Sequence, residues 1–180
     1  MLKSRQATLL LVALGFGLAG VLAQRFANPP EPLMGAPGEV RVAEVWDARL
    51  PDLAGRIQAL GQWQGKVLVL NFWAPWCPPC RKEIPDFIRL QERLGGAGLQ
   101  FVGVALDDPD KVAAFVDETG INYPILLGAE EASGLSLAAG NRLGGLPYTV
   151  VFDKRGAPVA TLTGGVTEAR LDALVKPLLE

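Results

Sequence analysis

The sequence predicts an α/β fold in which a central mixed sheet is flanked by helices on both faces. Residues 67–72 and 100–106 form continuous apolar runs rich in branched and aromatic side chains, which is typical of strands that are buried on both faces. A helical pattern lies between them, so the order strand, helix, strand predicts a parallel crossover. A hairpin pattern near the C-terminus adds antiparallel strands to the same sheet.

Caps and breakers delimit the first helices. Residues 81–94 carry apolar side chains at helical spacing, and the glycine pair that follows ends this pattern. Pro85 lies inside this helix, where we expect it to cause a kink. Asp108 and Pro109 predict the N-cap and first residue of a second helix, which ends at Gly120.

The rest of the C-terminal half reads as shorter elements. Residues 123–127 predict a third strand, and residues 130–141 predict a weak helix. Residues 148–153 and 159–162 flank a Lys-Arg-Gly turn and predict the hairpin. Residues 168–179 place Leu171, Leu174, Val175 and Leu178 on one face, which indicates a closing amphipathic helix.

Residues 40–66 have a weaker pattern. Val45, Trp46 and residues 50–55 suggest an extended edge element, and residues 57–63 suggest a short helix or turn. We expect Trp46 and Trp63 to serve as packing residues.

The first 26 residues have the form of an export segment. Lys3 and Arg5 precede an uncharged stretch over residues 6–24, which as a helix would span roughly 28 Å at about 1.5 Å per residue. This length favours an uncleaved membrane anchor that places the remaining chain outside the cytoplasm. Residues 21–23 also resemble a cleavage site, so a removable signal peptide stays an alternative.

Residues 27–39 are rich in proline and glycine, which predicts a linker without helix or strand. The globular domain is therefore expected over residues 40–180.

The composition excludes several classes of function. A net charge of −2 without a basic stripe argues against nucleic acid as a partner. The chain has no histidine, which removes His-based catalysis and His-ligated metal. Asp107, Asp108 and Asp110 are acidic neighbours, but capping of a helix explains them better than a metal site. We therefore predict no metal and no cofactor, and chemistry that depends on thiols and carboxylates.

Both cysteines of the chain lie in one Cys-x-x-Cys motif, Cys77 and Cys80, between a predicted strand and a predicted helix. A thiolate at a helix N-terminus is stabilised electrostatically, which points to a redox dithiol. Two cysteines are too few for a four-ligand zinc site. A purely structural disulfide is the weaker alternative, because so short a loop removes little entropy from the unfolded chain.

Residues 71–85, NFWAPWCPPCRKEIP, and residues 145–153, GLPYTVVFD, resemble the thioredoxin superfamily. Within it, the chain is similar to the membrane-anchored TlpA-like and ResA-like thiol:disulfide oxidoreductases. The resemblance covers residues 40–180 and implies a thioredoxin-like fold. It also implies a cis peptide bond between Leu146 and Pro147 beside the dithiol; the alternative is that Pro147 merely begins a hairpin strand.

The resemblance also bears on proton transfer. Many cytosolic thioredoxins have a buried aspartate at the position of Asn71, which cannot titrate. The resemblance instead assigns the tuning of the thiols and proton movement to Glu83, one helical turn after Cys80. A glutamate near a helix start is also explained by the helix dipole alone.

The residues predict a mechanism in which Cys77 is the N-cap and attacks the substrate disulfide, and Cys80 resolves the mixed disulfide. Pro79 has no amide to donate, so we expect a moderately lowered Cys77 pKa and a reducing couple. Substrate-binding positions are expected at Trp76, Pro78, Leu146 and Pro147, whereas Trp73 is expected in the core.

These observations predict a protein-disulfide reductase on the periplasmic face of the inner membrane. Its expected partners are disulfide-containing envelope proteins, including those of cytochrome c maturation or metal-site assembly, and an upstream membrane thiol reductant. One alternative is a Cu(I) carrier that uses the same two thiols. A dithiol peroxidase is a weaker alternative, because the Thr-x-x-Cys surroundings are missing.

Overall fold

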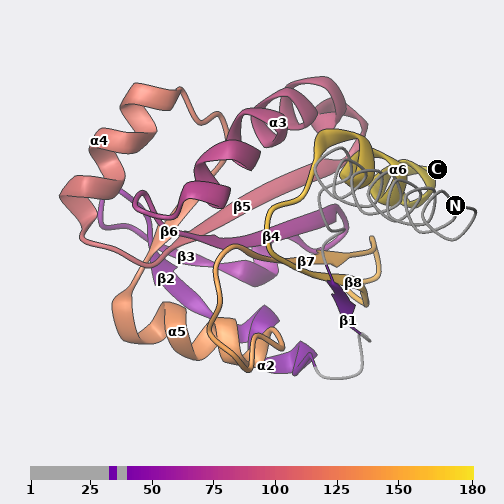
Figure 1. Cartoon of the computed structure of the whole chain (residues 1–180). Helices are drawn as coiled ribbons and strands as arrows, with labels where there is room; N and C mark the ends of the chain where they lie inside the picture. Colours follow the sequence, from indigo (N-terminus) through magenta and orange to yellow (C-terminus); the bar gives the residue numbers. More distant parts are fainter. Residues whose placement is uncertain (1–32, 36–39) are drawn as a thin grey trace, which may run out of the picture. The chain divides into compact units, whose positions relative to one another are not determined.

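A computed structural model describes residues 33–35 and 40–180 (Figure 1). The predicted anchor at residues 1–26 and most of the predicted linker lie outside these residues. Among the residues described, no helix combines the length and apolar character needed to cross a bilayer.

A mixed sheet forms the centre of the described part of the chain, as predicted, and it has six strands. β4 and β5 pair in parallel, as do β5 and β6, whereas β7 and β8 add antiparallel pairing. In the order in which they lie side by side, the strands are β1 (Leu33–Gly35), β8 (Pro158–Thr163), β7 (Tyr148–Phe152), β4 (Val67–Trp73), β5 (Leu99–Ala105) and β6 (Ile125–Leu127).

Helices cover both faces of this sheet (Figure 1). The helices on one face are α3 (Pro78–Leu94), α4 (Pro109–Thr119) and α6 (Glu168–Leu179). Those on the other face are α2 (Val42–Asp47) and α5 (Ala129–Ala138), with the 3₁₀ turn η2 (Leu60–Trp63). A second 3₁₀ turn, η3 (Gly95–Ala97), follows α3, which runs through Pro85 as one helix.

The side chains of β4 alternate between two apolar cores. Val67, Val69 and Trp73 belong to the core under α3, α4 and α6, whereas Leu68, Leu70 and Phe72 belong to the core under α2 and α5. This alternation follows from the two-residue period of a strand. Asn71 falls in the row that faces α3 and is its polar member, with 1% of its surface exposed.

The prediction for residues 40–66 is partly wrong. Val45 and Trp46 lie in helix α2, not in an extended element, and residues 57–59 form strand β3. β3 (Ile57–Ala59) pairs with β2 (Arg49–Pro51) as a separate antiparallel hairpin. Helix α2 is held by contacts with residues remote in sequence. Trp46 packs edge-on against Phe152 and donates a hydrogen bond to the Gly156 carbonyl.

The expectation that residues 27–39 contain no strand is wrong, because residues 33–35 form the short strand β1. Leu33–Gly35 pairs antiparallel with β8, with Met34 opposite Leu162. These three residues contain no proline, so their amides can take part in pairing. The edge of β8 therefore accepts a strand that composition alone did not predict.

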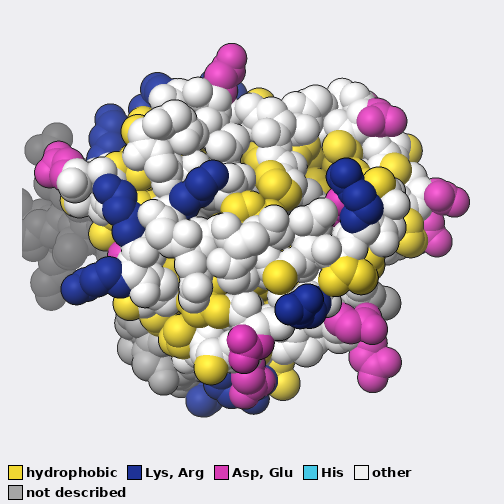
Figure 2. Space-filling view, turned by 180° about the vertical axis from the view of Figure 1, so that it is seen from behind, with side chains coloured by type: hydrophobic (Ala, Val, Ile, Leu, Met, Phe, Trp, Pro, Cys, Tyr) yellow, Lys and Arg dark blue, Asp and Glu magenta, His cyan; other side chains and the backbone are white. Residues whose placement is uncertain are grey.

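The surface in Figure 2 carries both signs of charge. Basic and acidic side chains are interspersed there with apolar patches, and the basic ones do not form a continuous stripe. This face therefore has the mixed character expected from the small net charge.

Candidate redox site

Cys77 and Cys80 form a disulfide at the N-terminus of α3. Cys77 is the N-cap, Pro78 and Pro79 are the first helical residues, and the Cys80 amide donates to Cys77 Sγ over 3.3 Å. Because Pro79 has no N–H, Cys80 supplies the amide donor that a cap normally receives from the second or third residue. The predicted cap is confirmed.

Both cysteines are buried: Cys80 is completely buried, and 3% of the surface of Cys77 is exposed. Trp76, directly before the pair, is 64% exposed, whereas Trp73 is buried in the core. The structure therefore agrees with the different positions predicted for these tryptophans. Trp46 and Trp63 are also buried, as expected of packing residues.

Leu146 and Pro147 are joined by a cis peptide bond, as the family resemblance implies. Antiparallel pairing of β4 with β7 places Phe72 opposite Tyr148. The Leu146–Pro147 turn therefore lies at the end of β4 from which the chain continues to Cys77. The Pro147 carbonyl accepts a 2.9 Å hydrogen bond from Gly164 N–H, which ties this turn to the segment before α6.

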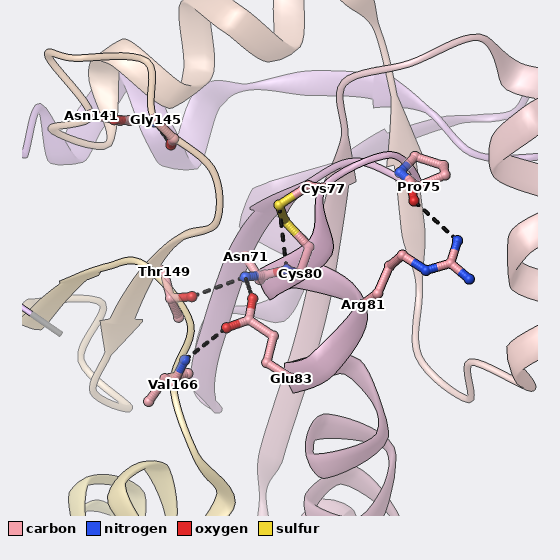
Figure 3. The surroundings of a disulfide bond; sticks show 10 residues. All are labelled: Asn71, Pro75, Cys77, Cys80, Arg81, Glu83, Asn141, Gly145, Thr149 and Val166. Atoms are coloured by element: carbon pink, nitrogen blue, oxygen red, sulfur yellow. Dashed lines mark hydrogen bonds between the residues drawn. A yellow bond between two sulfur atoms is a disulfide. The ribbon is translucent and has the colours of Figure 1, made fainter. Parts of the chain in front are cut away.

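A buried polar network lies below the disulfide (Figure 3). Asn71 Nδ2 donates to Glu83 Oε1 and to Thr149 Oγ1, both over 2.9 Å. The Val166 amide donates to Glu83 Oε2, also over 2.9 Å. The network thus joins β4, β7, α3 and the segment before α6 around one carboxyl group.

Glu83 is 2% exposed, so it is not a solvated residue near a helix start. Burial raises its pKa to about 8, and the negative charge of Asp86 acts in the same direction. The hydrogen bonds from Val166 and Asn71 oppose this shift by stabilising the ionised form. The pKa of nearby Tyr123 is raised by burial and by the charge of Glu83. A carboxyl group with a pKa near neutrality is suited to proton exchange.

Sequence reasoning did not assign roles to three residues of the site. Thr149 is part of the quoted motif, yet only strand pairing places it opposite Asn71. Val166 acts through its backbone amide, which leaves no side-chain signal in the sequence. Arg81 follows Cys80 directly, lies 5.0 Å from the Phe115 ring centre and donates to the Pro75 carbonyl.

The acidic residues before α4 act as the capping interpretation predicts. Asp108 is the N-cap and accepts from the Asp110 amide over 3.0 Å. Asp107 pairs with Lys111 over 3.4 Å. Within the part of the chain that the structure describes, no three Cys, Asp or Glu side chains are grouped as a metal site would require.

Comparison with known proteins agrees with this geometry. The model of the AhpC/TSA family matches residues 43–158. The thiol:disulfide interchange protein HelX of Rhodobacter capsulatus is 33% identical over 174 residues, covering 94% of this chain and 92% of HelX. The thiol-disulfide oxidoreductase ResA of Halalkalibacterium halodurans is 33% identical over 132 residues, covering 71% of this chain and 73% of ResA.

Solved structures show the same fold. A secreted thiol-disulfide isomerase from Corynebacterium glutamicum is 28% identical and has a TM-score of 0.68, with 74% of this chain and 83% of that protein covered. The family match, the relatives and the Cys77–Cys80 disulfide agree. The chain belongs to the AhpC/TSA family and is a thioredoxin-fold thiol-disulfide oxidoreductase similar to ResA and HelX.

Proposed function

We propose that this oxidoreductase works in the reducing direction on protein disulfides of the cell envelope. The observation that carries this proposal is the cap of α3, where, among the residues that the structure describes, Cys77 Sγ receives one amide hydrogen bond, from Cys80. Strongly oxidising dithiols require a highly stabilised thiolate. A cap with one donor, because Pro79 has none, stabilises the Cys77 thiolate less and so favours a reducing couple.

In the proposed cycle the Cys77 thiolate attacks a substrate disulfide and forms a mixed disulfide, releasing one substrate thiolate. Cys80, completely buried behind Cys77, then attacks Cys77 Sγ and releases the second substrate sulfur. The substrate gains two electrons and the protein is left with the Cys77–Cys80 disulfide. An upstream membrane thiol reductant must then restore the dithiol.

Glu83 is the proposed acceptor of the Cys80 proton. It lies three residues after Cys80 in α3, and its carboxyl group is held beneath the disulfide by Asn71 and Val166 (Figure 3). Its pKa of about 8 lies close to the pKa of an unperturbed thiol, so transfer between the two groups is nearly balanced.

The proposed substrate surface consists of Trp76, Pro78, Leu146 and Pro147. Trp76 and Pro78 are exposed beside Cys77, Leu146 is partly buried, and Pro147 is buried beneath this surface. An extended substrate segment could pair with the backbone at this turn, as in other strand-addition complexes. The expected substrates are envelope proteins that contain a disulfide, with cytochrome c maturation and metal-site assembly as the expected settings.

The proposed location is the periplasmic face of the inner membrane. The basic residues before the uncharged stretch at 6–24 support this orientation. The C. glutamicum relative, which is described as secreted, supports a site outside the cytoplasm. Fractionation of cells that produce the full chain, with protease added to spheroplasts, tests it; protection from the protease would contradict it.

Redox titration and substrate trapping test the proposed direction. We expect a potential nearer to about −270 mV than to the roughly −120 mV of strong envelope oxidants. A Cys80→Ser variant should accumulate a mixed disulfide through Cys77, whereas a Cys77→Ser variant should not. A potential near that of the oxidants, or no adduct with Cys80→Ser under turnover, would contradict the proposal.

The same preparation separates a disulfide reductase from a Cu(I) carrier and from a peroxidase. We expect the reduced protein to accelerate the reduction of insulin disulfides by dithiothreitol. Tight Cu(I) binding in equilibrium dialysis without insulin reduction would instead identify a metal carrier, and rapid oxidation by hydrogen peroxide would identify a peroxidase.

A further inference from the structure

The side chain of Asn71 is bonded on one side only. Its Nδ2 group uses both hydrogens, one toward Glu83 Oε1 and one toward Thr149 Oγ1. Its Oδ1 atom is buried and has no hydrogen-bond partner among the residues that the structure describes. Buried polar atoms without a partner are rare in folded proteins, and here Asn71 holds a hydrogen-bond acceptor that the present arrangement leaves unused.

The network around Glu83 suits only one of its protonation states. Each carboxylate oxygen accepts a hydrogen bond from an N–H group, of Asn71 or of Val166. An ionised carboxylate can accept both bonds, but a protonated carboxyl group must also donate. Burial raises the pKa of Glu83 to about 8, so the protonated group is well populated at neutral pH. In that state one carboxyl oxygen carries a hydrogen that needs an acceptor, and neither the Asn71 Nδ2 group nor the Val166 amide can accept it.

We propose that the side-chain amide of Asn71 reverses when Glu83 gains a proton, so that Asn71 positions this carboxyl group in both states. In the reversed amide, Oδ1 takes the place of Nδ2 and accepts hydrogen bonds from the Glu83 carboxyl and the Thr149 hydroxyl. A hydroxyl group can either donate or accept, so Thr149 serves both arrangements.

The chemistry of the side chain explains why asparagine suits this position. An amide presents a donor and an acceptor of nearly equal shape, and turning it over exchanges one for the other. An ionised aspartate would offer acceptors only, a protonated one would add a second titrating group beside Glu83, and a leucine would offer neither donor nor acceptor.

The inference rests on the proposed function in one respect, the source of the proton. During the resolving step the S–H bond of Cys80 breaks and its proton passes to Glu83. The electron pair left on Cys80 forms the bond to Cys77 Sγ, and the mixed disulfide breaks so that the substrate sulfur leaves as a thiolate. Reversal of Asn71 then stabilises the newly protonated Glu83.

The network also connects Glu83 to the Pro147 turn along two routes. Thr149 lies two residues after Pro147 in β7. Val166 lies two residues after Gly164, whose amide donates to the Pro147 carbonyl over 2.9 Å. The segments that hold the Glu83 carboxyl group therefore adjoin the proposed substrate surface.

The titration of Glu83 must be distinguished from the titration of the other ionisable groups that face it. These are Asp86 on α3, Tyr123 before β6 and, in the reduced protein, the thiols of Cys77 and Cys80. Work on the oxidised protein removes the thiols, and the raised pKa of Tyr123 keeps it neutral over the useful range.

Nuclear magnetic resonance of the oxidised full chain tests the reversal directly. With ¹⁵N-labelled asparagine and ¹³C-labelled glutamate, the Asn71 amide signals should change with the same midpoint as the Glu83 carboxyl signal. Contacts between the Asn71 amide protons and the Thr149 methyl group should be strong above that midpoint and lost below it. Asn122, which is exposed and donates to the Ile88 carbonyl, serves as the reference that should not change.

Unchanged Asn71–Thr149 contacts on both sides of the Glu83 midpoint would overturn the proposal. An Asn71→Asp variant provides a second test, because a second carboxyl group should raise the Glu83 midpoint by about one unit or more. The matched Asn122→Asp variant should leave it unchanged. An unaltered midpoint in a folded Asn71→Asp protein would also overturn the proposal.

These readouts need neither substrate nor reductant. A protein that shows the reversal but reduces no disulfides would disprove the proposed function alone, and the converse result would disprove the reversal alone.

Discussion

The backbone amide of Val166 donates a 2.9 Å hydrogen bond to Oε2 of Glu83, which joins the segment before α6 to the helix that carries the dithiol. A parallel contact lies about one turn further along α3, where Asp86 Oδ2 accepts from the Glu168 amide over 2.8 Å. Because Glu83 is buried and titrates in an accessible range, this junction has consequences for stability as well as for catalysis.

Glu83→Gln should change how stability depends on pH. The folded-state pKa of Glu83, about 8, lies above its ordinary value of 4.5, so the folded protein binds the proton more tightly. The free energy of unfolding should therefore fall as pH rises between these values, by at most about 5 kcal/mol. In urea unfolding of the oxidised Glu83→Gln variant, the free energy of unfolding should no longer fall over this pH range. A pH profile equal to that of the unmodified protein would contradict the assignment of Glu83 as a buried carboxyl group with a raised pKa.

Glu168→Gln is the matched control of opposite sign. Hydrogen bonding to Arg89, followed by that to Arg93, lowers the pKa of Glu168 below its ordinary value. The ionised Glu168 carboxylate should therefore add to the free energy of unfolding above its unfolded-state pKa. This added stability should be lost as pH falls through its folded-state pKa. The variant should thus lose stability at neutral pH relative to the unmodified protein and approach it in acid.

Alanine substitution of Trp76 and of Trp73 should separate substrate binding from packing. Trp76 is 64% exposed, so Trp76→Ala should raise KM for a disulfide substrate with little change in the free energy of unfolding. Trp73 is buried and packs 5.3 Å from the Phe115 ring, so Trp73→Ala should lower that free energy by about 3–5 kcal/mol. Unaltered kinetics for Trp76→Ala would remove it from the substrate surface.

Gly103→Ala should destabilise the sheet, because a Cβ at this position would lie 2.7 Å from Ile125 Cδ1 and 2.8 Å from Trp73 Nε1. Overpacking of this kind typically lowers the free energy of unfolding by about 1–3 kcal/mol. Gly134→Ala in α5 is the control, since a Cβ there meets nothing within 4 Å. It should stabilise the helix by about 0.5–1 kcal/mol, and a loss equal to that of Gly103→Ala would argue against the steric explanation.

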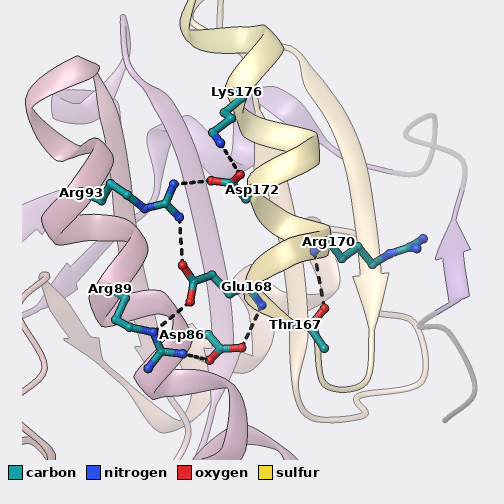
Figure 4. A network of polar contacts seen from close by, with 8 residues as sticks. All are labelled: Asp86, Arg89, Arg93, Thr167, Glu168, Arg170, Asp172 and Lys176. Atoms are coloured by element: carbon teal, nitrogen blue, oxygen red, sulfur yellow. Dashed lines mark hydrogen bonds and ion pairs between the residues drawn. The ribbon is translucent and has the colours of Figure 1, made fainter. Parts of the chain in front are cut away.

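The ion-pair network between α3 and α6 should make a small contribution that depends on salt (Figure 4). Arg93 bridges Glu168 and Asp172 at 2.9 and 2.8 Å, but its side chain is 43% exposed. Arg93→Ala should therefore lower Tm slightly in dilute buffer and less in 1 M salt, because mobile ions screen exposed pairs. Lys111→Ala removes one ion pair, with Asp107, and should change Tm less than Arg93→Ala. An equal drop in Tm for Arg93→Ala at both salt concentrations would contradict an electrostatic origin.

Apolar periodicity was sufficient to predict most of the fold. β4, β5, α4 and α6 follow from runs and caps that are local, such as Asp108 and Pro109 at the start of α4. The failures are short elements. α2 and the β2–β3 hairpin are too short for a clear period, and β1 depends on the edge of β8. Such elements take their conformation from remote partners, which a local pattern does not contain.

By itself the sequence determined the chemistry of this protein. Cys77 and Cys80 are two residues apart after a buried strand, and the prolines that follow Cys77 settle which amide can reach its sulfur. These features are local, because a helix cap involves only consecutive residues.

Only the tertiary structure decided what surrounds the carboxyl group of Glu83. Its partners Asn71 and Val166 lie 12 and 83 residues away in sequence, and Thr149 lies 78 residues from Asn71. No local pattern encodes such contacts. They arise because β7 pairs with β4 and α6 packs beside α3, and this burial shifts the pKa of Glu83 toward the range in which a thiol exchanges its proton.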